Sequence, residues 1–324
     1  MKSRIIAINN LGIKVIESLP LDVLHNLDIY HIHDQKNHSS LPMDKNLPKV
    51  TKIITNTKDL NQINYIFDCL DLYIVICDIQ SEDDYNFVIK ILNTINSKSE
   101  VILLFTKSNF LSYDFIKKIN LKATTTMLVS DISHSTHEFG ALRLSENRDL
   151  LINNFVNSIV SINRIIYETG DINIDFADLM SVIKDSNTSW FGHSRSSGKN
   201  KSTEVINKLL DLQFYQEGFY NATSMIVQIV SGEEIKMSEV KELTDKIKSF
   251  ANNECNIFFG IKRKKLLHNE IELIVLASTK KDYIENNSFY NIDYQKKYEK
   301  RTLSLSEIEL PPFMRKQEKI AETY

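Results

Sequence analysis

The chain has 324 residues, 42% of them hydrophobic and 25% charged, which is the composition of a globular protein long enough for two domains. A formal net charge of −3 excludes a broad electrostatic surface for nucleic acid, and no apolar run reaches the roughly 18 residues that a membrane span needs. Three widely spaced cysteines, without a Cys-x-x-Cys pair or a signal peptide, exclude a disulfide framework and predict a cytoplasmic protein.

Strands and helices alternate along residues 1–146. Alternation of this kind predicts parallel pairing in a doubly wound sheet. The nearly unbroken apolarity of "YIVICDI" and "VILLFT" indicates central strands that are buried on both faces. The predicted strands are 4–8, 27–33, 49–55, 71–79, 101–106 and 124–132, and the predicted helices are 12–19, 58–69, 83–97 and 111–119.

A long helix and a second, smaller α/β domain follow. Apolar residues at spacings of three and four predict one helix over 147–167, and Gly170 is a stop just beyond it. The second domain is predicted over 171–280 and is hinged on the long helix. A polar stretch at 194–203 is expected as a connection. Helices are predicted at 204–212 and 238–252, and strands at 223–230, 255–263 and 270–279.

From residue 281 to the end the sequence is polar, rich in tyrosine and without periodicity, which predicts a flexible tail. The tail contains a short apolar cluster with two prolines, "EIELPPFMRKQ", at 307–317. This order of residues favours a docking peptide over a tail that serves only solubility. The predicted partner-binding residues are Leu310, Pro311, Pro312, Phe313, Met314, Arg315 and Lys316.

Glycine is scarce, with 8 in the chain and none between Gly12 and Gly140, against a usual share of roughly 7%. Since glycine lets a backbone approach phosphate closely, the first domain has few means of holding a nucleotide. The acidic run 82–84 predicts a solvated helix N-terminus. His31 and His33 share one face of a strand, but the sequence fixes no further ligand, so no metal site is predicted.

Two aspartates, Asp175 and Asp178, stand at the start of a predicted helix in "INIDFADL". At an N-cap and the N3 position, both carboxylates would meet free backbone amides and the positive end of the helix dipole. The same pair could instead position water for a hydrolytic reaction. The residues alone leave both interpretations open.

Four features in the same order resemble the bacterial cell-division protein FtsZ, a relative of tubulin. "INIDFADLMSVI" is similar to its synergy loop, N-x-D-F-A-D, whose polar positions are Asn173, Asp175 and Asp178 here. Segments at 222–240 and 249–279 resemble its second domain, and "EIELPPFMRKQ" resembles the C-terminal peptide that binds membrane tethers and regulators. The resemblance implies a tubulin/FtsZ-like α/β fold: a doubly wound, mostly parallel sheet domain at 1–146, a central helix at 147–170, a smaller α/β domain at 171–280 and a flexible tail.

The sequence departs from the family where FtsZ binds nucleotide. Gly12 alone stands in place of the first glycine-rich loop, and "VICDIQSEDDYNFVI", with Ser81 at its centre, in place of the G-G-G-T-G-T-G signature. Carboxylates at 82–84 would repel a triphosphate. Asn153 stands where the family reads guanine with an aspartate, and an amide cannot accept both guanine donors. We therefore expect no bound GTP and no metal.

The resemblance implies a cytoskeletal protein at the division site. Without GTP it would be a pseudo-GTPase that joins, caps or regulates filaments of conventional FtsZ or of itself. Its synergy loop would act in trans on a neighbour's nucleotide, and its tail would bind an FtsA-like tether or another division regulator. The alternative is an atypical GTPase that binds GTP and polymerises on its own. A plasmid-partitioning relative fits less well, because such proteins end in basic tails. Neither nucleic-acid binding nor direct membrane insertion is expected.

Overall fold

The computed structural model describes residues 2–34, 50–55, 60–67, 70–106, 113–129, 144–184, 186–210, 221–265 and 267–280. Residues up to Tyr283 form one compact unit. The predicted tail and its docking peptide lie outside the described residues. Among the helices that are described, none combines the length and apolarity that crossing a membrane requires.

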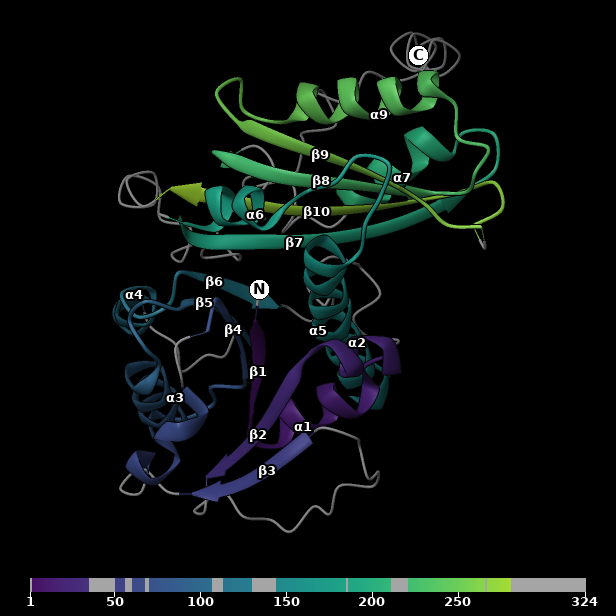
Figure 1. Cartoon of the computed structure of the whole chain (residues 1–324). Coiled ribbons are helices and arrows are strands. Elements are labelled where there is room, and N and C mark those ends of the chain that lie inside the picture. The colour runs from purple at the N-terminus through teal and green to yellow at the C-terminus, as the bar shows by residue number, and fades with distance from the viewer. Residues whose placement is uncertain are drawn as a thin grey trace, which may run out of the picture. The chain divides into compact units, whose positions relative to one another are not determined.

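Six parallel strands form the first part of the sheet, in the order β3-β2-β1-β4-β5-β6 (Figure 1). The parallel, doubly wound arrangement predicted from the sequence is confirmed. Every side chain of β4, and every side chain of β5 after Glu100, is buried, as the nearly unbroken apolarity of these two strands predicts; the side chains of β1 are buried as well. The bounds are β1 Ser3–Ile8, β2 Asp28–Asp34, β3 Val50–Thr55, β4 Leu72–Cys77, β5 Glu100–Thr106 and β6 Thr125–Val129.

Helices cover both faces of these strands (Figure 1). Helices α1 and α5 pack together on one face, and α3 and α4 pack on the other. The helix predicted at 58–69 is the 3-10 helix η2, and a short helix that was not predicted, α2, precedes β2. The bounds are α1 Asn9–Ser18, α2 Leu21–Asn26, η2 Leu60–Phe67, α3 Glu82–Thr94, α4 Tyr113–Asn120 and α5 Leu144–Tyr167.

The long helix α5 is the predicted central helix. Its apolar stripe is fully buried at Phe155, Ile159 and Ile162, which lie at the spacings of three and four that predicted it. The helix contacts α1, β6, β7 and α6 (Phe176–Ile183), so it touches both halves of the sheet. Its last turn therefore fixes where the following loop begins.

The strands of the second half continue the first sheet, in the order β6-β7-β10-β8-β9. β10 is antiparallel to both of its neighbours, whereas β8 and β9 are parallel to each other. Helices α7 and α9 pack on one face of these strands. The bounds are β7 Ser186–Ser197, α7 Lys201–Leu210, β8 Ser224–Ser231, α9 Met237–Phe250, β9 Asn256–Arg263 and β10 Glu270–Lys280.

Strand β7 differs from the prediction, because the polar stretch 194–203 is the end of this strand followed by the start of α7. Small hydroxyls let β7 be buried, since each can be satisfied by a hydrogen bond. Ser186 donates to Thr125 (2.9 Å), and Ser189 shares a 2.7 Å hydrogen bond with Thr125. These bonds join β7 to β6, and they explain how a polar sequence forms an interior strand.

Candidate functional site

The end of β1 leads directly into α1, with no loop between them. β1 ends at Ile8, and Asn9 begins the helix with a φ of 55°, a left-handed conformation that asparagine tolerates. Gly12 packs against the strand, because a Cβ there would lie 2.8 Å from the carbonyl carbon of Ala7. Gly12 thus has a packing role that the sequence does not reveal.

The end of β4 leads into a capped helix. Ser81 is the N-cap of α3: its Oγ accepts from the Asp84 amide (3.2 Å) and donates to Asp84 Oδ2 (2.7 Å). Asp84 Oδ2 also accepts from the Gln80 amide (3.3 Å), and Asp84 Oδ1 accepts from the Asn9 side chain (3.4 Å). A helix N-terminus is where proteins commonly bind an anion. Here a carboxylate of the chain itself lies at that position and links α3 to α1.

Further negative charge surrounds this junction. Glu82 and Asp83 are exposed beside Asp84, and Asp78 accepts hydrogen bonds from Gln80 (2.7 Å) and Thr106. Burial, together with the charges of Asp78 and Asp84, raises the pKa of the Cys77 thiol well above its usual value. Over the described part of the chain, no group of three or more His, Cys, Asp or Glu side chains is arranged to hold a metal ion.

Among the other sequence-predicted positions in this half, His31 contacts that junction through Asn9. Asn153 is an exposed residue of α5. His31 and His33 are buried on β2 with ring centroids 5.7 Å apart, and His31 Nε2 lies 2.9 Å from the carbonyl oxygen of Asn9. The first histidine therefore supports the start of α1.

The synergy-loop residues lie together in the turn between α5 and α6. Asp175 is the N-cap of α6, and its Oδ1 accepts from the Asp178 amide (2.8 Å). Asp178 Oδ2 accepts in return from the Asp175 amide (3.0 Å), which completes a capping box. Asn173 Oδ1 accepts from the Gly170 amide (2.6 Å). All three side chains thus shape the turn, while Asn173 and Asp175 stay exposed to solvent.

The loop is fastened to the edge strand β9 by its backbone. The amides of Asp171 and Ile172 donate to the carbonyl oxygen of Ile261 (2.8 and 3.2 Å), and the Ile261 amide donates to the Ile172 carbonyl (3.0 Å). A Cβ at Gly170 would lie 2.4 Å from that Ile261 oxygen, and one at Gly260 would lie 2.6 Å from Ile174. Gly170 is required for this close approach, because backbone would have to move, whereas at Gly260 the nearest atoms belong to the Ile174 side chain.

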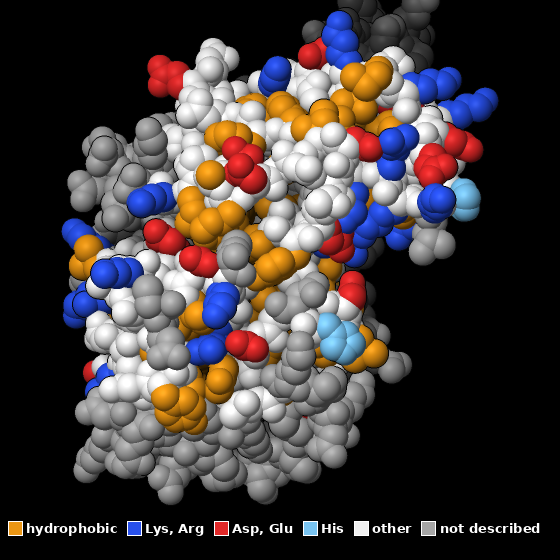
Figure 2. Space-filling view, in the orientation of Figure 1, with side chains coloured by type: hydrophobic (Ala, Val, Ile, Leu, Met, Phe, Trp, Pro, Cys, Tyr) orange, Lys and Arg blue, Asp and Glu red, His pale blue; other side chains and the backbone are white. Residues whose placement is uncertain are grey.

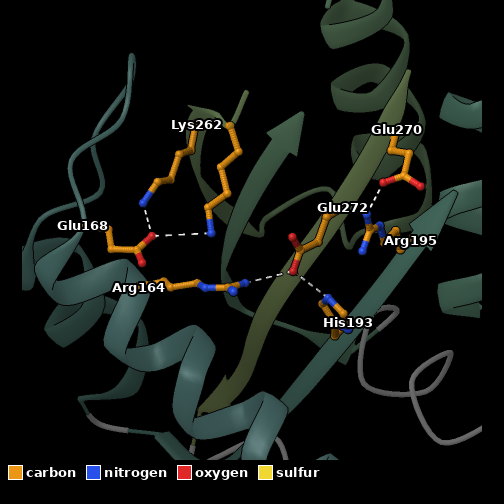
Figure 3. A network of polar contacts seen from close by, with 8 residues as sticks. Arg164, Glu168, His193, Arg195, Lys262, Glu270 and Glu272 are labelled. Atoms are coloured by element: carbon orange, nitrogen blue, oxygen red, sulfur yellow. Dashed lines mark hydrogen bonds and ion pairs between the residues drawn. The ribbon is translucent and has the colours of Figure 1, made fainter. Parts of the chain in front are cut away.

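Ion pairs fasten the same segment through side chains. Glu168 contacts Lys262 (Figure 3), and Asp171 accepts two hydrogen bonds from Arg263 (2.6 and 2.7 Å). Those hydrogen bonds lower the pKa of Asp171. The basic residues 262–264 are therefore used at this junction. On the face drawn in Figure 2, basic and acidic side chains gather beside the upper end of α5.

A buried carboxylate, Glu272 of β10, anchors α5 to the sheet. It accepts from Arg164 of α5 (3.0 Å) and lies 2.8 Å from His193 Nε2 of β7. Burial raises the pKa of Glu272, but the hydrogen bond and charge of His193, with Arg164 and Lys264, outweigh it and bring the pKa to about 2. The sequence carried a signal that was missed: a glutamate within the apolar strand 270–279 needs a cationic partner.

One part of the chain matches a protein-family model directly. Residues 188–280 match that of the FtsZ family, C-terminal domain. This range begins within β7 and ends with β10. It therefore includes β9, to which the loop is bonded, and β10, which carries Glu272.

Solved structures of low sequence identity share the fold. The empty FtsZ dimer of M. jannaschii aligns with a TM-score of 0.68 and 13% identity, over 87% of this chain and 89% of that one. The GTPγS-bound CetZ2 protofilament of Haloferax volcanii aligns at 0.62 and 12%, over 88% and 96%. The GDP-form TubZ protofilament of Bacillus thuringiensis serovar israelensis aligns at 0.62 and 11%, over 88% and 91%. The family-model match thus assigns residues 188–280 to the C-terminal domain of the FtsZ family, and the structural likenesses show that the chain has the fold shared by FtsZ, CetZ and TubZ.

Proposed function

We propose that this chain is an FtsZ-like filament protein whose own first domain does not bind GTP. The observation that carries this proposal is the carboxylate of Asp84 at the first turn of α3, bonded to Ser81, Gln80 and Asn9. A triphosphate there would have to displace that carboxylate and approach Glu82 and Asp83 as well, at a large electrostatic cost. The absence of a loop between β1 and α1 supports the same conclusion.

The chain would still associate with other subunits through the turn between α5 and α6. Two of the structures it resembles are described as protofilaments and a third as a dimer. In an assembly of this kind, Asn173, Asp175 and Asp178 would enter the nucleotide site of a neighbouring conventional FtsZ. A carboxylate pair can orient water beside a nucleotide when a bound cation offsets its repulsion from the phosphates.

Such a subunit would be asymmetric. Its loop would serve a neighbour's nucleotide, while its own first domain would offer no triphosphate to the next subunit's loop. Growth at that end of a filament would then stop. The chain would therefore cap or regulate division filaments, with a second copy of itself as the other possible neighbour.

We also propose that the peptide 307–317 binds an FtsA-like tether or another division regulator and brings the chain to the division site. Phe313 and Met314 suit an apolar groove, and Arg315 and Lys316 suit an acidic rim. Phe313→Ala should weaken binding by about 2 kcal/mol or more. Unchanged binding and unchanged localisation after removal of 307–324 would contradict this role.

Calorimetric titration of the purified chain with GTP tests the loss of nucleotide binding. At ~1 mM GTP, where half-saturation corresponds to about −4.1 kcal/mol, no binding heat is expected. A conventional FtsZ under the same conditions is the positive control. Submicromolar binding by this chain would overturn the proposal and favour the alternative, an atypical GTPase that polymerises on its own.

A further inference from the structure

The segment that would meet a neighbouring subunit is held from one side by a single strand. β9 supplies the backbone of Ile261, which exchanges hydrogen bonds with Asp171 and Ile172. The same strand supplies Arg263, whose guanidinium binds both carboxylate oxygens of Asp171. Two-point binding of this kind fixes orientation as well as distance.

Two groups of ion pairs differ in depth. The deeper group holds helix α5 (Figure 3): the side chains of Glu272 and Lys262 are only 11% and 12% exposed. In the outer pair, the side chains of Arg263 and Asp171 are 50% and 40% exposed, and this pair holds the loop and not helix α5. The outer pair can therefore be removed without uncovering a buried charge.

The loop held in this way presents its side chains outward. The side chain of Ile172, whose backbone bonds to β9, is 48% exposed, and Asn173 and Asp175 are exposed after it. The capping box of α6 fixes the far end of the segment. Its backbone is thus anchored at both ends while Ile172, Asn173 and Asp175 are accessible to a partner, so less conformational entropy would be lost on docking.

We propose that Arg263 is a positioning residue, which holds residues 170–175 in the shape in which they dock onto a neighbouring subunit. The docking step rests on the proposed function, whereas the positioning step concerns the free chain alone. β9 thereby acts as a platform for the loop in addition to its place in the sheet. Because the guanidinium of Arg263 bonds to Asp171 in the loop, its effect on docking should pass through that aspartate.

Hydrogen exchange of the free, full-length chain tests the positioning step. In Arg263→Gln, the amides of Asp171 and Ile172 should exchange about tenfold faster, since local opening governs their protection. The melting temperature should change little, because the pair is exposed. The matched control is Arg195→Gln, which removes an ion pair between β7 and β10 that involves Glu270 and not the loop. Unchanged exchange in Arg263→Gln, or equal acceleration in the control, would overturn the inference.

A charge swap tests whether the pair itself is responsible. Arg263→Asp should accelerate exchange in the loop, and adding Asp171→Arg should restore slow exchange. Failure of the double variant to restore it would contradict pairing as the cause. Binding to a conventional, GTP-loaded FtsZ is then measured for the same variants. If exchange responds as expected but binding of the wild-type chain is not detected, the positioning role stands and the proposed docking function fails.

Discussion

Two helix N-termini of this chain are closed by similar side chains in different surroundings. At α3, Ser81 and Asp84 bond to each other, and Asp84 also accepts a hydrogen bond from the side chain of Asn9 in the neighbouring helix α1. At α6, Asp175 and Asp178 bond reciprocally, in a turn that is held by β9 and exposed to solvent. The local capping chemistry is similar. Its consequence depends on the neighbours: carboxylates and α1 occupy the first junction, whereas the second presents its side chains outward.

The largest expected effect is a loss of stability at low pH, and it involves a residue that supports only one of the two junctions. Glu272 anchors α5 beside the second junction only. Its pKa of about 2 lies below the usual 4.5, so its contribution to stability is complete above about pH 4.5 and is lost as the pH falls toward 2. The shift corresponds to about 3 kcal/mol. Urea unfolding should show wild type losing more stability than Glu272→Gln between pH 5 and pH 2.5.

The acid response should also be local. At pH 3, the protection of amides against hydrogen exchange, corrected for the intrinsic rate, is expected to fall in the last turn of α5 and in residues 170–175 before it does so at the start of α3. An equal loss of protection at both junctions, or parallel stability curves for wild type and Glu272→Gln, would contradict a role for Glu272 in supporting the loop.

Two glycine substitutions sharpen the comparison further. Gly12→Ala would place a Cβ 2.8 Å from the backbone of Ala7, and Gly170→Ala would place one 2.4 Å from the Ile261 oxygen. Each should cost about 2 kcal/mol in urea unfolding, because backbone must move. Gly198→Ala is the control: its Cβ meets nothing within 4 Å, so the φ of +95° leaves a cost of about 1 kcal/mol.

Only Gly170→Ala should release the loop. Its variant is expected to show faster amide exchange at Ile172, whereas Gly12→Ala should leave that amide unchanged. A loop equally protected in both variants would mean that its close approach to β9 does not determine its stability.

The smallest effects come from the capping acids themselves. Asp84→Ala and Asp178→Ala should each lower the free energy of unfolding by about 1 kcal/mol, the usual worth of a helix cap. Only Asp178→Ala is expected to abolish the effect of the chain on the GTP turnover of a conventional FtsZ. If Asp84→Ala abolished that effect as well, the two junctions would not differ in function as proposed.

The sequence was sufficient for the fold because its elements follow from local patterns. Periodicity alone predicted α5, and unbroken apolar runs predicted β4 and β5 within a few residues. Strand β7 was not predicted, because a serine-rich sequence is typical of a loop. The hydrogen bonds of Ser186 and Ser189 to Thr125 show how it can be buried. Burial of a polar strand depends on partners that a one-dimensional pattern does not contain.

The candidate site was foreseeable in its residues and not in its contacts. The spacing of Asp175 and Asp178 gave the capping box as one of two interpretations, and the acids at 82–84 predicted a junction that repels phosphate. The partners are distant in the chain: Arg164 and Glu272 are 108 residues apart, and Arg263 and Asp171 are 92 apart. To predict that Asp84 takes the place of a bound anion, one would also have to know that α1 begins beside it.

The length of conventional FtsZ filaments, measured with a substoichiometric amount of this chain present, tests the central claim most directly. A subunit that offers a loop but no nucleotide of its own should stop growth at one face, so filaments should become shorter as the chain is added. Asp178→Ala should shorten them equally while abolishing the change in GTP turnover, since docking uses more than this one acid. Unchanged filament length and turnover at equimolar mixing would contradict the account and leave Asp175 and Asp178 as ordinary helix caps.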